Sequence, residues 1–201
     1  HLFANGKPKF KIVVEGANLF FTNDARMVLE DAGVTLFKDA STNKGGVTSS
    51  SKEVLAALAL DDATFAANMS VKDPKNPPKF YMQYVKEIQE TVEALADAEF
   101  ECLWREKQRT GQHSHELTDK VSEKINRLND FVQDSETLWA NVPVRNAVLK
   151  KALPKSLVEL VGLESIIARV PENYLKAIHA AFLASQYVYK HGLAANEFSF
   201  F

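Results

Sequence analysis

The stretch KIVVEGANLFFTNDARMVLEDAGVTLF, residues 11–37, changes its hydrophobic period twice. The β-branched run at its start, residues 11–14, predicts a strand, and the apolar spacing of residues 23–31 predicts a helix. The run at residues 34–37 returns to strand-forming residue types and predicts a second strand. Strand, helix and strand in this order indicate a right-handed parallel βαβ unit, which is the default topology.

Two residues are expected to set the ends of the helix within this unit. Thr22 is suited to cap its first turn, and Gly33 is suited to end it in a left-handed turn. Two strands alone do not bury both faces of a parallel sheet. We therefore expect the unit to pack on the helices that follow, or on a sheet that lies outside this sequence, and we interpret it as a truncated Rossmann-like unit.

The rest of the chain is predicted to be helical. Residues 42–51 are small, polar and glycine-containing, so they predict a loop, which leads into a buried helix at residues 54–60. No convincing strand follows Asp62, and the helical stretches are interrupted by Pro77, Pro78, Gly111, Pro143, Pro154, Gly162, Pro171 and Gly192. The predicted fold class is mostly α with a small α/β part, divided into a nucleotide-binding part at 1–60 and a helical region at 61–201.

Three amphipathic helices stand out in the helical region. The longest is predicted to run from Pro77-Pro78 to about Arg109, and two others cover residues 117–128 and 175–188. The tail at 194–201 holds three phenylalanines without a helical period. We expect this tail to dock on another subunit or on a domain outside this sequence.

Composition excludes several classes of partner. The chain has 201 residues, with 24 Lys and Arg against 26 Asp and Glu, and its formal net charge of -2 does not attract nucleic acid or anionic lipid. Neither a signal-type segment nor a membrane-length apolar run is present in the sequence. With Cys102 as the single cysteine, a reducing, soluble compartment is expected: the cytoplasm, with the mitochondrion as the alternative. Because the first residue is His1, we interpret the chain as a fragment.

Several catalytic motifs are missing from the sequence. The eight glycines contain no Gly-x-Gly pair, so the dinucleotide fingerprint and the P-loop are absent, as are HExxH, CxxC and the nucleophile elbow. His113 and His115 form the one close histidine pair, and we interpret them as part of a solvated turn rather than a metal site. For Cys102, a small packed residue is favoured over a reactive thiol.

Two segments do not read as ordinary packing. Glu15-Gly16-Ala17-Asn18 follows a predicted strand at the end where open α/β sheets bind ligands, although a plain βα turn explains the same residues equally well. The segment at 39–51 also follows a strand. Its Gly45-Gly46 pair permits close approach of the backbone to a ligand, and its hydroxyls lead into a helix N-terminus. Ser50 with Glu53 also fits a capping box, a purely structural alternative.

In these two segments the sequence resembles the glutamate dehydrogenases. That family has an EGAN turn and, one βα step later, an NAGGV loop followed by a substrate-binding serine; here they read EGAN at 15–18 and NKGGVTSS at 43–50. The stretches FECLWREKQRTG, RNAVLKKALPKSLVELVG and RVPENYLKAIHAAFLASQYVYKHG look like the C-terminal region of the large-subunit, NAD-specific class of fungi and other lower eukaryotes. The resemblance covers nearly the whole chain. It departs from the small-subunit pattern at 19–21, where Leu-Phe-Phe replaces a Gly-Pro turn, and at Lys44, where alanine is usual.

The resemblance implies roles for individual residues. It implies that Asn18 lies by the nicotinamide ribose of NAD within the turn that includes Gly16 and Ala17. It further implies that Asn43 lies near the nicotinamide and the substrate, that Ser50 bonds a substrate carboxylate, and that Gly45 and Gly46 allow close approach. The catalytic lysine and aspartate of the family belong to an upstream domain, so no catalytic residue and no metal ligand is assigned here.

The implied activity is oxidative deamination of L-glutamate to 2-oxoglutarate and ammonia with NAD, as part of amino-acid and nitrogen metabolism. The implied partners are glutamate or 2-oxoglutarate, the upstream domains of the same polypeptide and further copies in a homo-oligomer, with no nucleic acid and no membrane. We expect the fragment alone to be inactive. A non-catalytic helical assembly module remains an alternative, and so does a nucleotide-binding protein of another chemistry.

Overall fold

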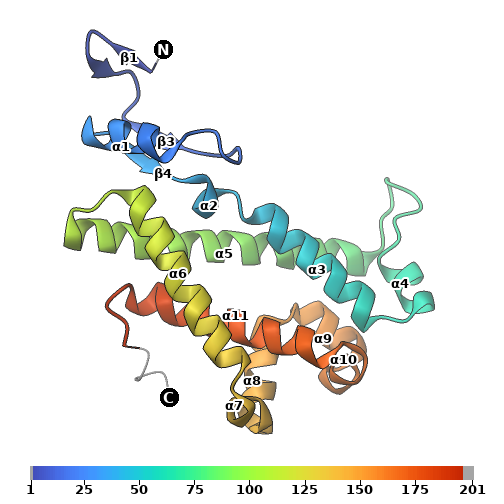
Figure 1. Cartoon of the computed structure of the whole chain (residues 1–201). Helices are drawn as coiled ribbons and strands as arrows, with labels where there is room; N and C mark the ends of the chain where they lie inside the picture. The colour runs from blue at the N-terminus through green and yellow to red at the C-terminus, as the bar shows by residue number, and fades with distance from the viewer. Residues whose placement is uncertain (1, 197–201) are drawn as a thin grey trace. The chain divides into compact units, whose positions relative to one another are not determined.

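The computed structural model describes residues 2–196, and Figure 1 shows the order of its helices and strands. The chain divides into two compact units, each assembled from several segments. Among the described residues, the first unit combines 2–45 with 95–126 and 186–196, and the second combines 46–94 with 127–185. The predicted domain boundary at residue 60 stays a prediction.

The strands described are short and lie near the N-terminus, and helices make up most of the rest. The strands are β1 (Phe3–Ala4), β2 (Lys7–Pro8), β3 (Ile12–Val14) and β4 (Thr35–Phe37). The helices are α1 (Asn23–Asp31), α2 (Asp39–Thr42), α3 (Gly45–Ala59), α4 (Asp62–Asn68), α5 (Lys79–Thr110), α6 (Ser114–Gln133), α7 (Glu136–Ala140), α8 (Val142–Ala152), α9 (Lys155–Val161), α10 (Leu163–Arg169) and α11 (Glu172–His191). The predicted fold class, mostly α with a small α/β part, is confirmed.

The predicted parallel strand pair is present in the first unit. β3 and β4 are parallel neighbours, with Ile12 opposite Thr35 and Val14 opposite Phe37. The helix that joins them in sequence, α1, contacts β4. Leu29, Val34 and Leu36 are buried here, and burying each such side chain stabilises the fold by roughly 1.5–3 kcal/mol.

The two predicted ends of α1 are confirmed. The hydroxyl oxygen of Thr22 accepts a hydrogen bond from the backbone N–H of Ala25 at 3.2 Å. After the helix, Gly33 has a φ of 86°, and the next N–H, that of Val34, donates to the carbonyl of Leu29 at 3.0 Å. Glycine adopts this left-handed backbone at little cost because it has no Cβ.

A hairpin of β1 and β2 was not predicted. The two strands are antiparallel, with Phe3 opposite Pro8, and the residues between them, Asn5 and Gly6, have φ values of 53° and 75°. Positive φ at both central residues is the geometry of the tight turns that favour Asn-Gly. The dipeptide is therefore the sequence signal that identifies this hairpin.

The predicted loop at residues 42–51 is wrong, because most of these residues are helical. α2 ends at Thr42 and α3 begins at Gly45, which leaves two residues between the helices. Glycine and serine are poor helix formers, but tertiary packing overrides propensity when the apolar face of a helix is buried. Leu55, a residue of α3 with no exposed surface, anchors that face in the core of the second unit.

The core of the second unit is built from helices and the residues directly next to their ends. It gathers apolar side chains from α3, α5 and from the helices α7 to α11, and the phenol of Tyr84 within it donates a hydrogen bond to the carbonyl of Lys52 at 2.6 Å. The core residues are Leu55, Ala56, Ala59, Leu60, Tyr84, Trp139, Leu149, Leu153, Leu157, Leu163, Ile166, Val170 and Leu175.

The predicted interruptions coincide with helix ends. Gly111, Gly162 and Gly192 follow α5, α9 and α11 with φ values of 71°, 80° and 70°. The three predicted amphipathic helices correspond to α5, α6 and α11. Within 2–196, none of the helices combines the length and the apolar character needed to cross a membrane. The docking prediction for the tail concerns mainly residues 197–201, which lie outside the described residues.

Candidate functional site

The two candidate segments leave the same edge of the parallel strand pair. β3 ends at Val14 and β4 ends at Phe37, and the parallel register aligns these two ends. The ladder continues one step further, because the N–H of Glu15 donates to the carbonyl of Phe37 at 3.0 Å. The carboxyl edge of such strands is where open α/β sheets bind ligands.

A buried charge network holds the first segment. The guanidinium of Arg26 on α1 donates from Nε and Nη2 to the two carboxylate oxygens of Glu15, at 2.7 and 2.8 Å, and from Nη2 to Asp39 Oδ1 at 3.1 Å. The side chains of Arg26, Glu15 and Asp39 are 3%, 0% and 7% exposed. Because one guanidinium bonds two buried carboxylates, one from each segment, both segments are fixed to α1.

Asp39 also fixes the backbone that follows the EGAN turn. Its Oδ2 accepts a hydrogen bond from the N–H of Leu19 at 2.7 Å, and its Oδ1 accepts one from Ala40 at 2.8 Å. Leu19 has a φ of 54°, an uncommon value for a residue with a branched side chain. Burial alone raises the pKa of the Asp39 carboxyl, but these hydrogen bonds and the charge of Arg26 outweigh burial, so its pKa lies below the ordinary value.

The Glu15 carboxylate likewise favours the charged form of Arg26. The hydrogen bond to Glu15 is the largest influence on the guanidinium and raises its pKa, against the opposing effect of burial. An arginine guanidinium stays protonated in proteins, so Arg26 carries its positive charge between Glu15 and Asp39. The guanidinium is held between the carboxylates of Glu15 and Asp39.

The amide side chains of the two motifs meet at this edge. Asn43 Nδ2 donates a hydrogen bond to Asn18 Oδ1, and the hydroxyl of Thr42 donates to the carbonyl of Glu15. Asn18 is exposed and Asn43 is half-buried. The structure therefore brings together two of the predicted site residues that lie 25 positions apart.

Two of the predicted glycines have open space beside them. A Cβ placed on Gly16 or on Gly46 meets no atom within 4 Å. A ligand can thus approach either backbone without a side chain in the way, which is the reason for glycine that the sequence suggested. Ala17 lies in the same exposed turn as Gly16, and Gly45 is the first residue of α3.

Ser50 lies inside α3 and does not cap it. The helix begins five residues earlier, at Gly45, and the Ser50 hydroxyl donates to the carbonyl of Val47 at 3.1 Å. The capping-box interpretation with Glu53 is therefore wrong, because a cap must precede the first helical turn. Ser50 is exposed and belongs to the second compact unit.

Comparison with known proteins agrees with the two motifs. The family model described as Glutamate/Leucine/Phenylalanine/Valine dehydrogenase matches residues 3–111, more than half of the chain. The chain belongs to this dehydrogenase family. Both candidate segments lie within the matched residues 3–111 of this chain.

Individual dehydrogenases are similar over nearly all of this chain. Glutamate dehydrogenase 2 of Dictyostelium discoideum is 51% identical over 98% of it, and the NAD-specific glutamate dehydrogenase of Neurospora crassa is 48% identical over 100%. A probable NAD-specific glutamate dehydrogenase of Schizosaccharomyces pombe is 47% identical over 98%. The chain spans 19%, 19% and 18% of these relatives. No solved structure matches it. The predicted resemblance is confirmed.

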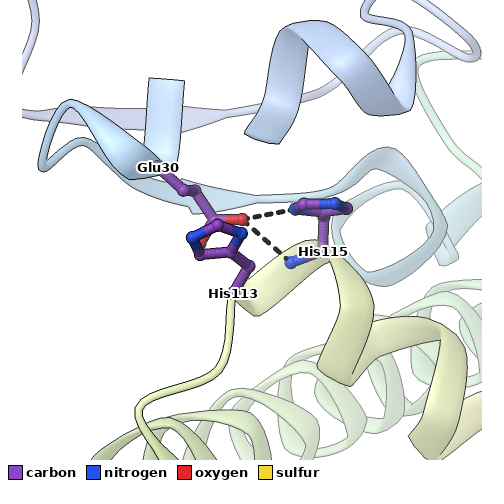
Figure 2. A group of neighbouring side chains, drawn as sticks. All are labelled: Glu30, His113 and His115. Atoms are coloured by element: carbon purple, nitrogen blue, oxygen red, sulfur yellow. Dashed lines mark hydrogen bonds and ion pairs between the residues drawn. The ribbon is translucent and has the colours of Figure 1, made fainter. Parts of the chain in front are cut away.

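The histidine pair of this dehydrogenase chain is not a solvated turn, so that interpretation is wrong. Figure 2 shows His113 and His115 beside Glu30 of α1. The carboxylate of Glu30 is fully buried, and its Oε2 forms a hydrogen bond with His115 Nδ1 at 2.6 Å. Its Oε1 accepts hydrogen bonds from the N–H of Ser114 at 2.7 Å and from Lys107 Nζ at 3.0 Å. His113 Nε2 pairs with Asp31 at 3.1 Å. Sequence reasoning missed this cluster because its partners are 85 positions apart.

The Glu30 cluster has the residue types of a metal site but the bonding of a helix cap. The three ligand atoms of Glu30, His113 and His115 lie within 4.8 Å of one another. Both carboxylate oxygens already accept hydrogen bonds, and the nearby Lys107 ammonium repels a cation. The N-terminus of α6, whose free amides favour a negative charge, explains why a carboxylate is buried here.

We expect Glu30→Gln to flatten the acid side of the stability profile. Burial raises the pKa of Glu30, but the bonds from His115, Ser114 and Lys107 outweigh burial, so its pKa lies below the ordinary value of 4.5. A lowered pKa contributes stability that is present above pH 4.5 and is lost as the pH falls through the folded-state pKa. Thermal unfolding of the original protein and of Glu30→Gln between neutral and acid pH measures this loss of stability. Glu116→Gln, at an exposed position, is the control. At pH 7 the loss for Glu30→Gln should be about 1.5–3 kcal/mol, and equal profiles for the two variants would contradict it.

Cys102 is a packed residue, as predicted. It has no exposed surface, and its thiol donates a hydrogen bond to the carbonyl of Val188 at 3.6 Å. Burial raises the pKa of the thiol above its ordinary value. A neutral, enclosed thiol is a poor nucleophile, so the geometry does not support catalysis by Cys102.

Proposed function

We propose that the chain is part of an NAD-dependent glutamate dehydrogenase and contributes one wall of its cofactor and substrate cleft. The observation that carries the proposal is the contact between the side-chain amides of Asn18 and Asn43. It joins the two motif segments at the carboxyl edge of the parallel strands. The buried network of Arg26 supports the proposal, because it holds the backbone of both segments while their amides stay accessible.

Each predicted site residue has a role in this proposal. The exposed turn of Gly16, Ala17 and Asn18 takes the nicotinamide ribose, and Asn43 lies against the nicotinamide and the substrate. Gly45 and Gly46 allow close approach of the backbone, with open space beside Gly46 as support. Ser50 donates a hydrogen bond to a carboxylate of glutamate.

In the proposed reaction, NAD would be held by the turn of Gly16, Ala17 and Asn18 together with Asn43, and when bound it would supply the acceptor for the hydride that leaves the α-carbon of L-glutamate. The resulting imine takes up water and releases ammonia, which leaves 2-oxoglutarate. The residues of this chain bind and orient both molecules, and we propose that the proton-transferring lysine and aspartate belong to upstream domains of the same polypeptide. Positioning of this kind accounts for a large part of enzymatic rate enhancement.

The proposal includes the setting of the enzyme. We propose a homo-oligomeric protein of amino-acid and nitrogen metabolism, located in the cytoplasm or the mitochondrion. Neither nucleic acid nor membrane is a proposed partner. The relatives named NAD-specific support NAD as the cofactor.

The longer protein that contains this chain should form NADH from L-glutamate and NAD, whereas the 201-residue chain alone should form none. The isolated chain has neither the Gly-rich fingerprint nor a match to the catalytic lysine and aspartate motifs. The absorbance of NADH at saturating NAD and glutamate measures the activity of both proteins. L-leucine and L-valine are assayed separately as alternative substrates.

Two results would contradict the proposal in different ways. If the longer protein oxidises leucine or valine and not glutamate, the reaction class stands and the substrate is wrong. If the longer protein forms no NADH from any amino acid and still assembles, the chain is better explained as a helical assembly module.

A further inference from the structure

Lys44 forms an ion pair with a buried carboxylate far away in the sequence. Its Nζ contacts Oε2 of Glu99, which lies on α5, 55 positions further along the chain. The side chain of Glu99 is 3% exposed, and that of Lys44 is 42% exposed. Lys44 thus reaches from the surface of the first unit to a charge in its interior.

Glu99 has few other ways to satisfy its charge. Its Oε2 also accepts a hydrogen bond from the hydroxyl of Tyr189 at 2.7 Å, while its Oε1 has no hydrogen-bond partner among the described residues. A buried carboxylate without a cation is strongly unfavourable. The ion pair with Lys44 is therefore expected to persist. An ion pair between two exposed residues differs, because water readily replaces either partner.

Tyr189 fixes the orientation of the Glu99 carboxylate. This tyrosine of α11 is 8% exposed, and burial, followed by the nearby charge of Glu99, raises the pKa of its hydroxyl. The hydroxyl remains protonated and can act only as the donor toward Glu99. One carboxylate oxygen is thereby presented to Lys44 in a constant place.

The anchored lysine is the neighbour of Asn43. Lys44 is the one residue between Asn43, which follows α2, and Gly45, which begins α3. The N–H of Asn43 donates to the carbonyl of Asp39 at 3.0 Å, so the backbone is already held on its N-terminal side. Anchoring Lys44 on Glu99 holds it on the other side and leaves the Asn43 amide directed at Asn18.

We infer that Lys44, Glu99 and Tyr189 are positioning residues that hold Asn43 in place for the cofactor and the substrate. The inference rests on the proposed function and deepens it, because it gives α5 and α11 a part in setting the geometry of the site. None of the three residues touches the reacting atoms in this scheme. They act through the backbone of Asn43.

The test uses the longer protein with Lys44→Met, Glu99→Gln and the double variant. Methionine keeps the apolar stem of lysine and removes the charge. With glutamate at saturating NAD, kcat for Lys44→Met should fall roughly tenfold, because a small misplacement of an orienting group is costly. The double variant should lose far less than the product of the two single losses, since both remove the same interaction. Lys44→Arg keeps a cation at this position and should recover most of the rate.

Lys86→Met is the matched control, because Lys86 on α5 forms an exposed ion pair with Glu90 at 3.7 Å. Its kcat should stay within about twofold of the original protein, as expected for a surface pair. A Lys44→Met protein with unchanged kcat and KM but a lower unfolding temperature would overturn the inference, because the ion pair would then be only structural.

Hydrogen exchange separates this inference from the proposed function. In Lys44→Met the backbone N–H of Asn43 should exchange about tenfold faster with solvent, and in Lys86→Met its exchange rate should not change. Equal exchange in the two variants overturns the inference whether or not the protein is active. If the original protein forms no NADH from glutamate, the proposed function fails, and the exchange rates still decide whether Lys44 holds Asn43.

Discussion

Replacing Arg26 by methionine is expected to lower the free energy of unfolding by about 3–5 kcal/mol, because it leaves two buried carboxylates without their cation. Arg26 is the shared partner of Glu15 and Asp39, and all three side chains are at most 7% exposed. For a chain of this length the loss corresponds to a fall of roughly 6–20 °C in the thermal midpoint. Thermal and urea unfolding measure both quantities.

A matched control and a rescue make this expectation specific. Arg127 of α6 is exposed and has no ion pair among the described residues, so Arg127→Met should change stability by less than about 0.5 kcal/mol. Adding Glu15→Gln and Asp39→Asn to Arg26→Met should restore much of the loss, since the uncompensated charges are then removed. A fall of under about 1 kcal/mol for Arg26→Met would contradict the assignment of this network as the support of the two motif segments.

The elements predicted correctly are those whose signals are local. Thr22, the apolar spacing of α1 and Gly33 lie within a dozen residues, and each acts through its own neighbours. The same holds for the glycines and prolines that separate the helices from α5 to α11. Local capping and backbone preferences do not depend on the rest of the fold, so the sequence alone predicts them.

The elements predicted wrongly depend on distant partners. The Gly- and Ser-rich start of α3 has poor helix propensity, and its helical structure is explained by burial of Leu55 and its neighbours against other helices. The sequence around His115 predicted a loop, because no nearby residue indicated Glu30 as the partner of this histidine. The hairpin at Asn5-Gly6 is a different case, since its signal is local: Asn-Gly is the dipeptide that tight two-residue turns favour.

The same distinction between local signals and distant partners applies to the candidate site. The sequence and the family resemblance identified Asn18 and Asn43, and the structure brings their side chains together. Neither source indicated that Arg26 or Glu99 supports them, because those contacts join segments 11 and 55 positions apart. Asn18 and Asn43 lie in motifs that can be read from the sequence, whereas the contacts of Arg26 and Glu99 with these segments are seen only in the fold.

Ser50→Ala in the longer protein is expected to lower kcat/KM for glutamate roughly ten- to a hundredfold, which corresponds to about 1.5–3 kcal/mol for a hydrogen bond to a charged group. The serine lies inside α3, is exposed and donates to the carbonyl of Val47 at 3.1 Å. Alanine is the better helix former by up to about 0.5 kcal/mol, so the fold should not be destabilised. A kinetic loss therefore reports binding and not folding.

The neighbouring serines provide a matched control for Ser50. Ser49 and Ser51 donate to the carbonyls of Gly46 and Thr48 at 2.9 and 2.8 Å, the same pattern on other faces of α3. To bind a substrate carboxylate, the Ser50 hydroxyl must turn away from Val47, and this trade is favourable because a neutral bond contributes only about 0.5–1.5 kcal/mol. With glutamate varied at saturating NAD, Ser49→Ala and Ser51→Ala should keep kcat/KM within about twofold. An equal, small effect at all three positions would remove Ser50 from the site, because its hydroxyl would then serve the helix alone.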